Sequence, residues 1–349
     1  MAQDKKATWK NLDRLWRRPD MLALDIDENK YVVFSDMHLG NGGGADDFCR
    51  NVGAMQRALD YYRENGYKLI LLGDIEEFWQ FGLKEIRQQY ADTIYKKIKA
   101  FGDENVYRVW GNHDSEWGGL EDPARNQPRI FATAAEALKM KDKDGHQCIL
   151  LLHGHQGSTE SDKSAWLVRH FVRVWRYIKP LFKELGLWYY PSATKSQVSR
   201  DYERIFYSWA KKNKAIIICG HSHRAIFASE SYMEILLARM RTALAVILRI
   251  TSTVSAILSG LFMISKSLWY WWEELLRKRR IVPMDRKGYL KPCYFNAGCA
   301  LYKDGITAIE IADDEICLVE WKREVKDGKE KEEFHTGKLS GFIDKVREG

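Results

Sequence analysis

Five short segments that carry carboxylate, amide and imidazole side chains constrain this chain more than any other feature. They are Asp36-Met37-His38, Gly73-Asp74, Gly111-Asn112-His113-Asp114, His153-Gly154-His155 and Gly220-His221-Ser222-His223. A short apolar run precedes each segment, as expected of a buried strand that ends in a loop. Residues that follow the carboxyl ends of neighbouring strands gather at one edge of a sheet. The sequence therefore predicts that these distant segments meet in a single site.

The spacing of apolar residues predicts an α/β fold. Strands are expected at 31–34, 68–72 and 106–110, with amphipathic helices at 46–65 and 83–101 between them. This β-α-β-α-β order is typical of a partly parallel sheet. Further strands are expected at 136–140, 147–152 and 215–219, followed by a closing meander at 294–320. We also expect a hairpin at 21–35 and a charged, partly disordered tail after Lys322.

Charge and cysteine usage bear on partners and location. The 349 residues carry a formal net charge of +7, which favours an anionic partner such as phosphate, a lipid headgroup or nucleic acid. The six cysteines form no C-x-x-C pair, as is usual for buried free thiols in a reducing compartment. The polar N-terminal residues contain no apolar signal segment. We therefore expect a cytoplasmic protein.

The donor types in the five segments suit hard or borderline divalent cations, which bind carboxylate, amide oxygen and imidazole groups. Asp74 is the expected bridge between two ions, because it directly follows a glycine at a strand end. One ion would be bound by Asp36, His38, Asp74 and His223, and the other by Asp74, Asn112, His153 and His221. Two such ions can activate water and clamp both oxygens of an in-line phosphoryl displacement. Mn²⁺ is the expected metal, with Fe, Zn and Mg²⁺ as alternatives.

Other polar residues near these ligands are expected to serve the substrate. His113 can give a proton or electrostatic support to a leaving alkoxide, and Asp114 would hold its ring in the useful tautomer. Asn112 and Arg224 are candidates for contact with a substrate phosphate. Glu77 and His155 are expected to lie behind the ligands and to orient them.

The segments resemble the calcineurin-like metallophosphoesterase superfamily, whose pattern is D-x-H, G-D-x-x-[DE], G-N-H-[DE], H and G-H-x-H in this order. The resemblance covers roughly residues 30–320 outside the inserts. It implies a sandwich of two mixed sheets flanked by helices, and it implies the same metal ligands, with Asp74 as the bridge. We therefore expect one α/β metallophosphoesterase domain over residues 1–349, with a helical cap formed by two inserts.

Within that superfamily, two segments are similar to the UDP-2,3-diacylglucosamine diphosphatases, which hydrolyse a pyrophosphate on a lipid-linked sugar nucleotide. Residues 73–79 resemble their G-D-x-x-E-x-W, and residues 220–224 resemble their G-H-T-H-R. One position departs from this pattern, because that branch usually has arginine where this chain has His113.

The two inserts are expected to be helical. Residues 158–213 would form a cap, in which basic and aromatic side chains alternate as they do at membrane interfaces. Residues 230–285 combine the 16 uncharged residues Ile250–Ser265 with the basic cluster Arg277–Arg280. An uncharged run of this length falls short of the ~20 residues that span a bilayer. A helix lying on an anionic membrane surface fits this pattern, and a buried helix or an oligomer contact are the alternatives.

These observations predict a dinuclear metal-dependent hydrolase of phosphoester or pyrophosphate bonds. Its substrate would be a lipid-linked or amphiphilic phosphate, and the protein would lie in the cytoplasm or peripherally on the inner face of the membrane. A nucleotide or nucleic-acid phosphodiesterase, or a phosphomonoesterase, is the alternative enzyme. A membrane-recruited binding protein with a vestigial site is the alternative outside the enzymes. The oligomeric state is left open.

Overall fold

The computed structural model describes residues 5–118, 134–156, 173, 176–180, 197–231, 291–326 and 328–348. The chain forms two compact units, one made of Met1–Ser229 and Lys291–Gly349 and the other of Glu230–Leu290. Of the second unit, only the short strand β10 (Glu230–Ser231) is described. Most of the predicted inserts at 158–213 and 230–285 lies outside the described residues. The prediction of one domain with two inserts therefore stays a prediction.

One sheet of the larger unit contains the predicted β-α-β-α-β segment. Its strands lie in the order β14 (Lys329–Lys338), β13 (Glu315–Lys326), β12 (Gly305–Ala312), β2 (Lys30–Phe34), β3 (Tyr67–Leu72), β4 (Val106–Val109) and β5 (Ala134–Ala135). Neighbours from β2 to β5 are parallel, whereas β12 runs antiparallel to β2. The central strands are continuous apolar runs, such as the fully buried Leu69–Leu72, because a parallel sheet is covered on both faces.

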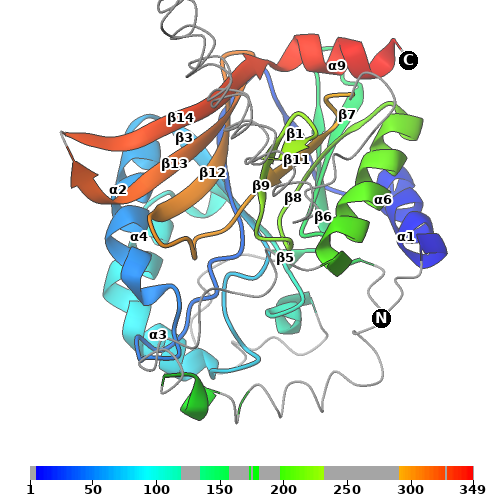
Figure 1. The fold of residues 1–349 in the computed structure, drawn as a ribbon. Coiled ribbons are helices and arrows are strands. Elements are labelled where there is room, and N and C mark those ends of the chain that lie inside the picture. Colours follow the sequence, from blue (N-terminus) through cyan, green and yellow to red (C-terminus); the bar gives the residue numbers. More distant parts are fainter. Residues whose placement is uncertain are drawn as a thin grey trace, which may run out of the picture. The chain divides into compact units, whose positions relative to one another are not determined.

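Helices α2 (Val52–Glu64), α3 (Leu83–Tyr90) and α4 (Lys96–Lys99) connect these strands, and a π-helical stretch at Ala91–Tyr95 joins α3 to α4. Short 3₁₀ turns lie at Cys49–Asn51, Asp103–Asn105 and Ser115–Gly118. The buried side chains of α2, from Ala54 to Tyr62, recur at helical spacing. They share a hydrophobic core with Phe34 and Leu71, so that α2 covers one face of the sheet (Figure 1).

The second sheet supplies the other half of the site. Within the larger unit its strands lie in the order β1 (Ala23–Asp25), β6 (Ala137–Lys141), β7 (Gln147–Leu152), β8 (Ile216–Cys219), β11 (Tyr294–Ala297) and β9 (Ala225–Phe227). Helices α1 (Lys5–Arg17) and α6 (Gln197–Asn213) lie side by side next to this sheet, with the Trp16 and Trp209 rings 5.8 Å apart (Figure 1). The predicted α/β class with two sheets flanked by helices is confirmed.

Three sequence-based expectations are wrong: two concern the pairing of strands, and one concerns disorder of the tail. Residues 21–35 form no hairpin, because β1 pairs in parallel with β6 whereas β2 belongs to the other sheet. The closing segment is not one meander, because β11 pairs with β8 and β9 whereas β12 and β13 pair in the first sheet. The tail is ordered: β14 pairs with β13, and α9 (Leu339–Arg347) buries Leu339, Ile343 and Val346. A charged surface on an edge strand discourages further pairing and does not by itself imply disorder.

Among the described helices, none has the length and apolar character that a membrane crossing requires.

Candidate metal centre

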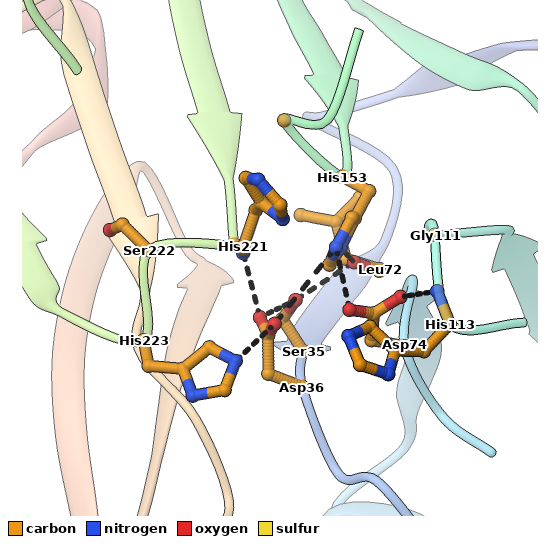
Figure 2. Close-up of polar contacts among 12 residues, drawn as sticks. Ser35, Asp36, Leu72, Asp74, Gly111, His113, His153, His221, Ser222 and His223 are labelled. Atoms are coloured by element: carbon orange, nitrogen blue, oxygen red, sulfur yellow. Dashed lines mark hydrogen bonds and ion pairs between the residues drawn. The ribbon is translucent and has the colours of Figure 1, made fainter. Parts of the chain in front are cut away.

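Loops at the carboxyl ends of strands from both sheets bring the predicted ligands together. Asp36 and His38 follow β2, Asp74 follows β3 and Asn112 follows β4; His153 follows β7, and His221 and His223 follow β8. Figure 2 shows the side chains of Asp36, Asp74, His153 and His223 pointing toward one another. The tight loops hold several ligands in an unusual backbone conformation, because Asp36, His38, Asp74, His221 and His223 have φ between 50° and 66°. Residues with a β-carbon seldom adopt this conformation, and such strain concentrates at functional sites.

The first cluster consists of Asp36, His38 and His223, all of them buried, with potential ligand atoms within 4.8 Å of one another. His223 Nε2 lies 3.1 Å from Asp36 Oδ1 and 3.2 Å from His38 Nε2. Two imidazole nitrogens and a carboxylate oxygen that converge in this way match the donor set predicted for one divalent cation.

The second cluster consists of Asp74, His153 and His221. His153 Nε2 lies 3.1 Å from Asp74 Oδ2. The side-chain oxygen of Asn112, the predicted amide ligand of this ion, is buried and has no hydrogen-bond partner among the described residues. A buried polar atom without a partner is costly, and a bound cation would remove that cost.

Asp74 lies between the two clusters. Its Oδ2 atom is 3.1 Å from Nε2 of His153 in the second cluster and 3.7 Å from Nε2 of His38 in the first. Its other oxygen, Oδ1, accepts a hydrogen bond of 2.8 Å from the backbone N–H of His113. Asp74 is therefore the carboxylate within reach of histidines from both clusters.

Hydrogen bonds behind the ligands select the tautomer that a metal requires. Nδ1 of His38 donates to Glu77 Oε2 (2.9 Å), and Nδ1 of His153 donates to the backbone carbonyl of Leu72 (2.9 Å). Both acceptors lack a proton, so Nδ1 carries the hydrogen and Nε2 of the neutral ring presents its lone pair to the cluster.

Asp36 is oriented in a corresponding way. Its Oδ2 accepts hydrogen bonds from the Ser35 hydroxyl (2.5 Å) and from the His221 backbone N–H (2.9 Å). Its Oδ1 is buried without a hydrogen-bond partner in the described part of the chain. Asp36 Oδ1, Asn112 Oδ1 and His153 Nε2 are thus among the buried atoms without a hydrogen-bond partner in the described residues, and their donor types fit divalent cations.

The pKa shifts show how strongly these groups interact. Burial by itself raises the pKa of Asp36, but the charges of His223 and His153 outweigh burial and bring the pKa below its ordinary value. Burial lowers the pKa of His153, yet Asp74 and Asp36 raise it to about 9. Burial and the neighbouring His153 lower the pKa of His221 to about 3. Without a bound cation, protonated imidazoles supply positive charge beside the buried carboxylates.

Two glycines allow the loops to approach one another closely. A β-carbon at Gly111 would lie 2.1 Å from Asp74 Oδ1, and one at Gly220 would lie 1.9 Å from the Ser35 hydroxyl oxygen. Both distances are far below van der Waals contact. The glycines in these segments are therefore required because a neighbouring backbone or carboxylate occupies the space of a side chain.

The predicted partnership between Asp114 and His113 is wrong. Asp114 is fully buried and accepts hydrogen bonds from the backbone N–H groups of Gly111 (2.6 Å) and Ile75 (2.8 Å) and from Arg108 (2.8 Å). Nδ1 of His113 instead donates to Glu77 Oε1 (2.8 Å). Asp114 therefore holds backbone in place beneath the site, because the turn that exposes His113 directs the next side chain inward.

Glu77 contacts a predicted metal ligand and the predicted proton donor at the same time. One oxygen of this buried carboxylate accepts from His38 and the other accepts from His113. Burial alone raises the pKa of Glu77, but the charge of His113 and the hydrogen bonds from both rings bring it below its ordinary value. The Trp79 ring stacks on His113, with centroids 4.0 Å apart and 20° between the planes. The His113 ring is thus fixed by a hydrogen bond and by an aromatic neighbour.

His155 and Arg224 lie beside the ligands. His155 is buried next to the Trp110 ring (4.9 Å between centroids), and burial together with His153 keeps its pKa well below the ordinary value. The guanidinium of Arg224 donates to Glu203 of α6 (2.5 Å). The orienting role of His155 and the phosphate contact of Arg224 stay predictions.

Sequence reasoning missed two residues that support the His221–His223 loop. The side-chain amide of Asn296 donates to the carbonyl of Gly220 (2.7 Å), and the Tyr302 hydroxyl donates to the carbonyl of His223 (2.7 Å). Asn296 could have been found, because Phe295-Asn296-Ala297-Gly298 places an amide at the end of an apolar strand, as in the other segments. No comparable local signal marks Tyr302.

Comparison with known proteins gives the class to which this site belongs. Residues 30–225, more than half of the chain, match the model of the calcineurin-like phosphoesterase family. The chain therefore belongs to the calcineurin-like phosphoesterases. It is a metal-dependent hydrolase of phosphoester bonds. No curated protein sequence matches it.

Several solved structures are similar, although distantly. One is a conserved uncharacterised protein from Streptococcus pneumoniae TIGR4, described as a predicted phosphoesterase, with 13% identity and a TM-score of 0.30 over 87% of this chain and 96% of that chain. A mutant of a cold-active protein tyrosine phosphatase has 12% identity and a TM-score of 0.37 over 90% and 82% of the two chains. Another structure of a cold-active protein tyrosine phosphatase has 13% identity and a TM-score of 0.35 over 89% and 80%. These scores are too low to add to the family assignment.

Proposed function

We propose that this phosphoesterase uses two divalent ions that share Asp74. The observation that carries the proposal is the position of Asp74 Oδ2, which lies near a histidine of each cluster. Asp36, His38 and His223 would complete one ion site, and Asn112, His153 and His221 would complete the other. When bound, the pair would supply Lewis acidity that activates water and neutralises charge on the phosphoryl oxygens.

The chain's own residues would orient the substrate and manage the leaving group. Nδ1 of His113 is held by Glu77, so a proton destined for a leaving alkoxide would be carried on Nε2. The stack on Trp79 restricts rotation of the ring, which keeps that nitrogen in one direction. Asn112 is the candidate for contact with a phosphoryl oxygen, and Arg224 is the candidate for a more distant phosphate.

We further propose a lipid-linked or otherwise amphiphilic phosphate as the substrate, with cleavage of a pyrophosphate bond at a cytoplasmic membrane surface. The similarity of residues 73–79 and 220–224 to the UDP-2,3-diacylglucosamine diphosphatases supports this choice. The basic and aromatic composition of 158–213 and the apolar run in 230–285 also support it. In the described part of the first insert, Tyr177 and Ile178 are 72% and 41% exposed, as suits an apolar partner.

A phosphodiesterase or phosphomonoesterase acting on nucleotides or nucleic acid is the second candidate. His113 favours it, because this chain has histidine where the diphosphatases usually have arginine. An imidazole can protonate an alkoxide, whereas an arginine supplies charge without giving up a proton.

Turnover by the full chain loaded with Mn²⁺ tests the proposal, with Fe, Zn and Mg²⁺ compared in parallel. The substrates are UDP-2,3-diacylglucosamine in mixed micelles, bis-p-nitrophenyl phosphate and p-nitrophenyl phosphate. Preferred cleavage of the pyrophosphate supports the lipid-linked substrate. Turnover of the aryl esters alone rejects that substrate and favours the second candidate.

The variant Asp74→Ala is the control for the metal centre, because removal of a bridging ligand affects both ions. It should lose nearly all activity and bind neither ion normally. If the variant keeps one tightly bound ion and most of its turnover, the proposal that two ions share the Asp74 carboxylate is rejected.

A further inference from the structure

A buried arginine beneath the metal centre is not explained by the predicted ligands. Arg108 belongs to β4 and is 2% exposed. Its guanidinium donates to both oxygens of Glu76, one of them at 3.2 Å, and to Asp114 Oδ2 at 2.8 Å. Glu76 and Asp114 are fully buried. The positively charged guanidinium of Arg108 therefore lies between two carboxylates and, being planar with several donors, can bind both at once.

Asp114 transmits this arrangement to the ligands. Its Oδ1 accepts from the N–H of Gly111, the residue before Asn112, and its Oδ2 accepts from the N–H of Ile75, the residue after Asp74. One carboxylate therefore fixes the backbone next to the bridging ligand and next to the amide ligand. A second link joins the same two loops, because His113 N–H donates to Asp74 Oδ1 (2.8 Å).

Glu76 anchors the other side of Arg108. The Tyr95 hydroxyl donates to Glu76 Oε1 (2.8 Å), and the Trp117 indole donates to Glu76 Oε2 (3.0 Å). The Arg108 guanidinium also lies over the Trp117 ring, 4.7 Å from its centroid. The guanidinium consequently has one position, and Asp114 takes its orientation from it.

We propose that Arg108 is a positioning residue for the phosphoester hydrolysis proposed above, acting through Asp114 on Asp74, Asn112 and His113. Its guanidinium is enclosed by Glu76, Asp114 and the Trp117 ring. Its effect is to hold the carboxylate of Asp74, the amide oxygen of Asn112 and the ring of His113 in fixed positions relative to one another. Mutation of a residue that orients metal ligands in this way typically lowers metal affinity or activity about 10- to 100-fold.

The test is Arg108→Lys, which keeps the charge but cannot donate to both carboxylates in the same geometry. We expect a folded protein with kcat lowered about 10- to 100-fold, a KM within about threefold, and weaker Mn²⁺ binding at one of the two sites. Rates with aryl phosphodiesters of rising leaving-group pKa should fall more steeply than in the wild type, because His113 is displaced. Asp114→Asn should show the same pattern, and the double variant should be no worse than the more severe single variant.

A matched control separates positioning from general stability. Lys331→Met removes another ion pair of the same sheet, between Lys331 and Glu310 (2.9 Å), which is not among the metal-binding loops. It should lower the melting temperature and leave kcat and the leaving-group dependence unchanged. If Arg108→Lys does not fold, Tyr95→Phe removes a single hydrogen bond to Glu76 and should give a smaller change of the same kind.

Two outcomes would overturn the inference. Arg108→Lys with kcat and Mn²⁺ affinity within twofold of the wild type would show that Arg108 has no positioning role. A loss of stability equal to that of Lys331→Met, with kinetics unchanged well below the melting temperature, would assign it a structural role only. If the wild type binds Mn²⁺ but hydrolyses no phosphoester, the proposed function fails, and the Mn²⁺ titration of the variants alone decides the role of Arg108.

Discussion

Glu77→Gln is the perturbation that best tests how the site is organised. The carboxylate of Glu77 accepts one hydrogen bond from His38 and one from His113, at 2.9 and 2.8 Å. An amide has one oxygen and one NH₂ group, so it can accept from only one of the two rings. The other ring must lose its hydrogen bond or move its proton to Nε2. In His38 that change would remove the lone pair that faces the first cluster.

The expected magnitude follows from the loss of one hydrogen bond to a charged group. Such bonds contribute about 1.5–3 kcal/mol. Because about 1.4 kcal/mol corresponds to a factor of ten, the variant should lose about 10- to 100-fold in one quantity. A ring change at His38 would lower Mn²⁺ affinity at the first cluster, and a ring change at His113 would lower kcat with both ions bound.

Isothermal titration with Mn²⁺ and steady-state hydrolysis of bis-p-nitrophenyl phosphate measure the two quantities separately. Glu310→Gln is the control for loss of a buried negative charge, because Oε1 of Glu310 accepts both side-chain hydrogen bonds, from Tyr62 (2.6 Å) and Lys331 (2.9 Å), and an amide oxygen can still accept both. It should lower the free energy of unfolding without changing either quantity. The reasoning is refuted if Glu77→Gln keeps both Mn²⁺ affinity and kcat within twofold of the wild type.

His113→Ala should keep both ions yet slow turnover sharply, most for esters with poor leaving groups; equal rates across a leaving-group series would remove His113 as the proton donor. Mn²⁺ affinity should rise with pH, by up to about tenfold per unit, at pH values below about 9, because an ion must displace the proton that Asp74 and Asp36 hold on His153. The same proton stabilises the ion-free fold below pH 6.5, and this contribution to the free energy of unfolding is lost as the pH rises through about 9. A Mn²⁺ affinity that does not change with pH below about 9 would contradict the role of His153 as a ligand. Deletion of residues 235–280 should reduce flotation with anionic liposomes while aryl phosphodiester turnover persists, and equal flotation with and without the segment would reject a membrane role for it.

The arrangement of the ligands could be predicted because each motif is local. A polar residue within two positions after a buried strand must lie at the sheet edge, whatever the rest of the chain does, and this holds for Asp36, Asp74 and His153 alike. Strand partners could not be predicted in the same way. The turn after Asp25 suits a hairpin, yet β1 pairs with β6, more than a hundred residues away, because pairing depends on which apolar faces meet in the folded core.

The residues that support the site likewise divide into those that the sequence could point to and those whose contacts depend on the fold. Asp114 follows His113 directly in the sequence, which suggested that the two side chains interact. Backbone direction decides otherwise, because the turn sends Asp114 toward Arg108 and leaves His113 to Glu77. Tyr302, whose hydroxyl supports the carbonyl of His223, carries no sequence signal because its partner is a backbone group nearly eighty residues away.

The sequence by itself determined the chemical types of the candidate ligands, their order and the strands that present them, because these properties depend on residue identity and on a two- or three-residue neighbourhood. Only the tertiary structure decided which oxygen of Asp74 faces both clusters and which nitrogen of each imidazole is free. It also decided that one buried arginine lies under the loops. Those features depend on hydrogen bonds and burial between segments that meet only when both sheets have formed.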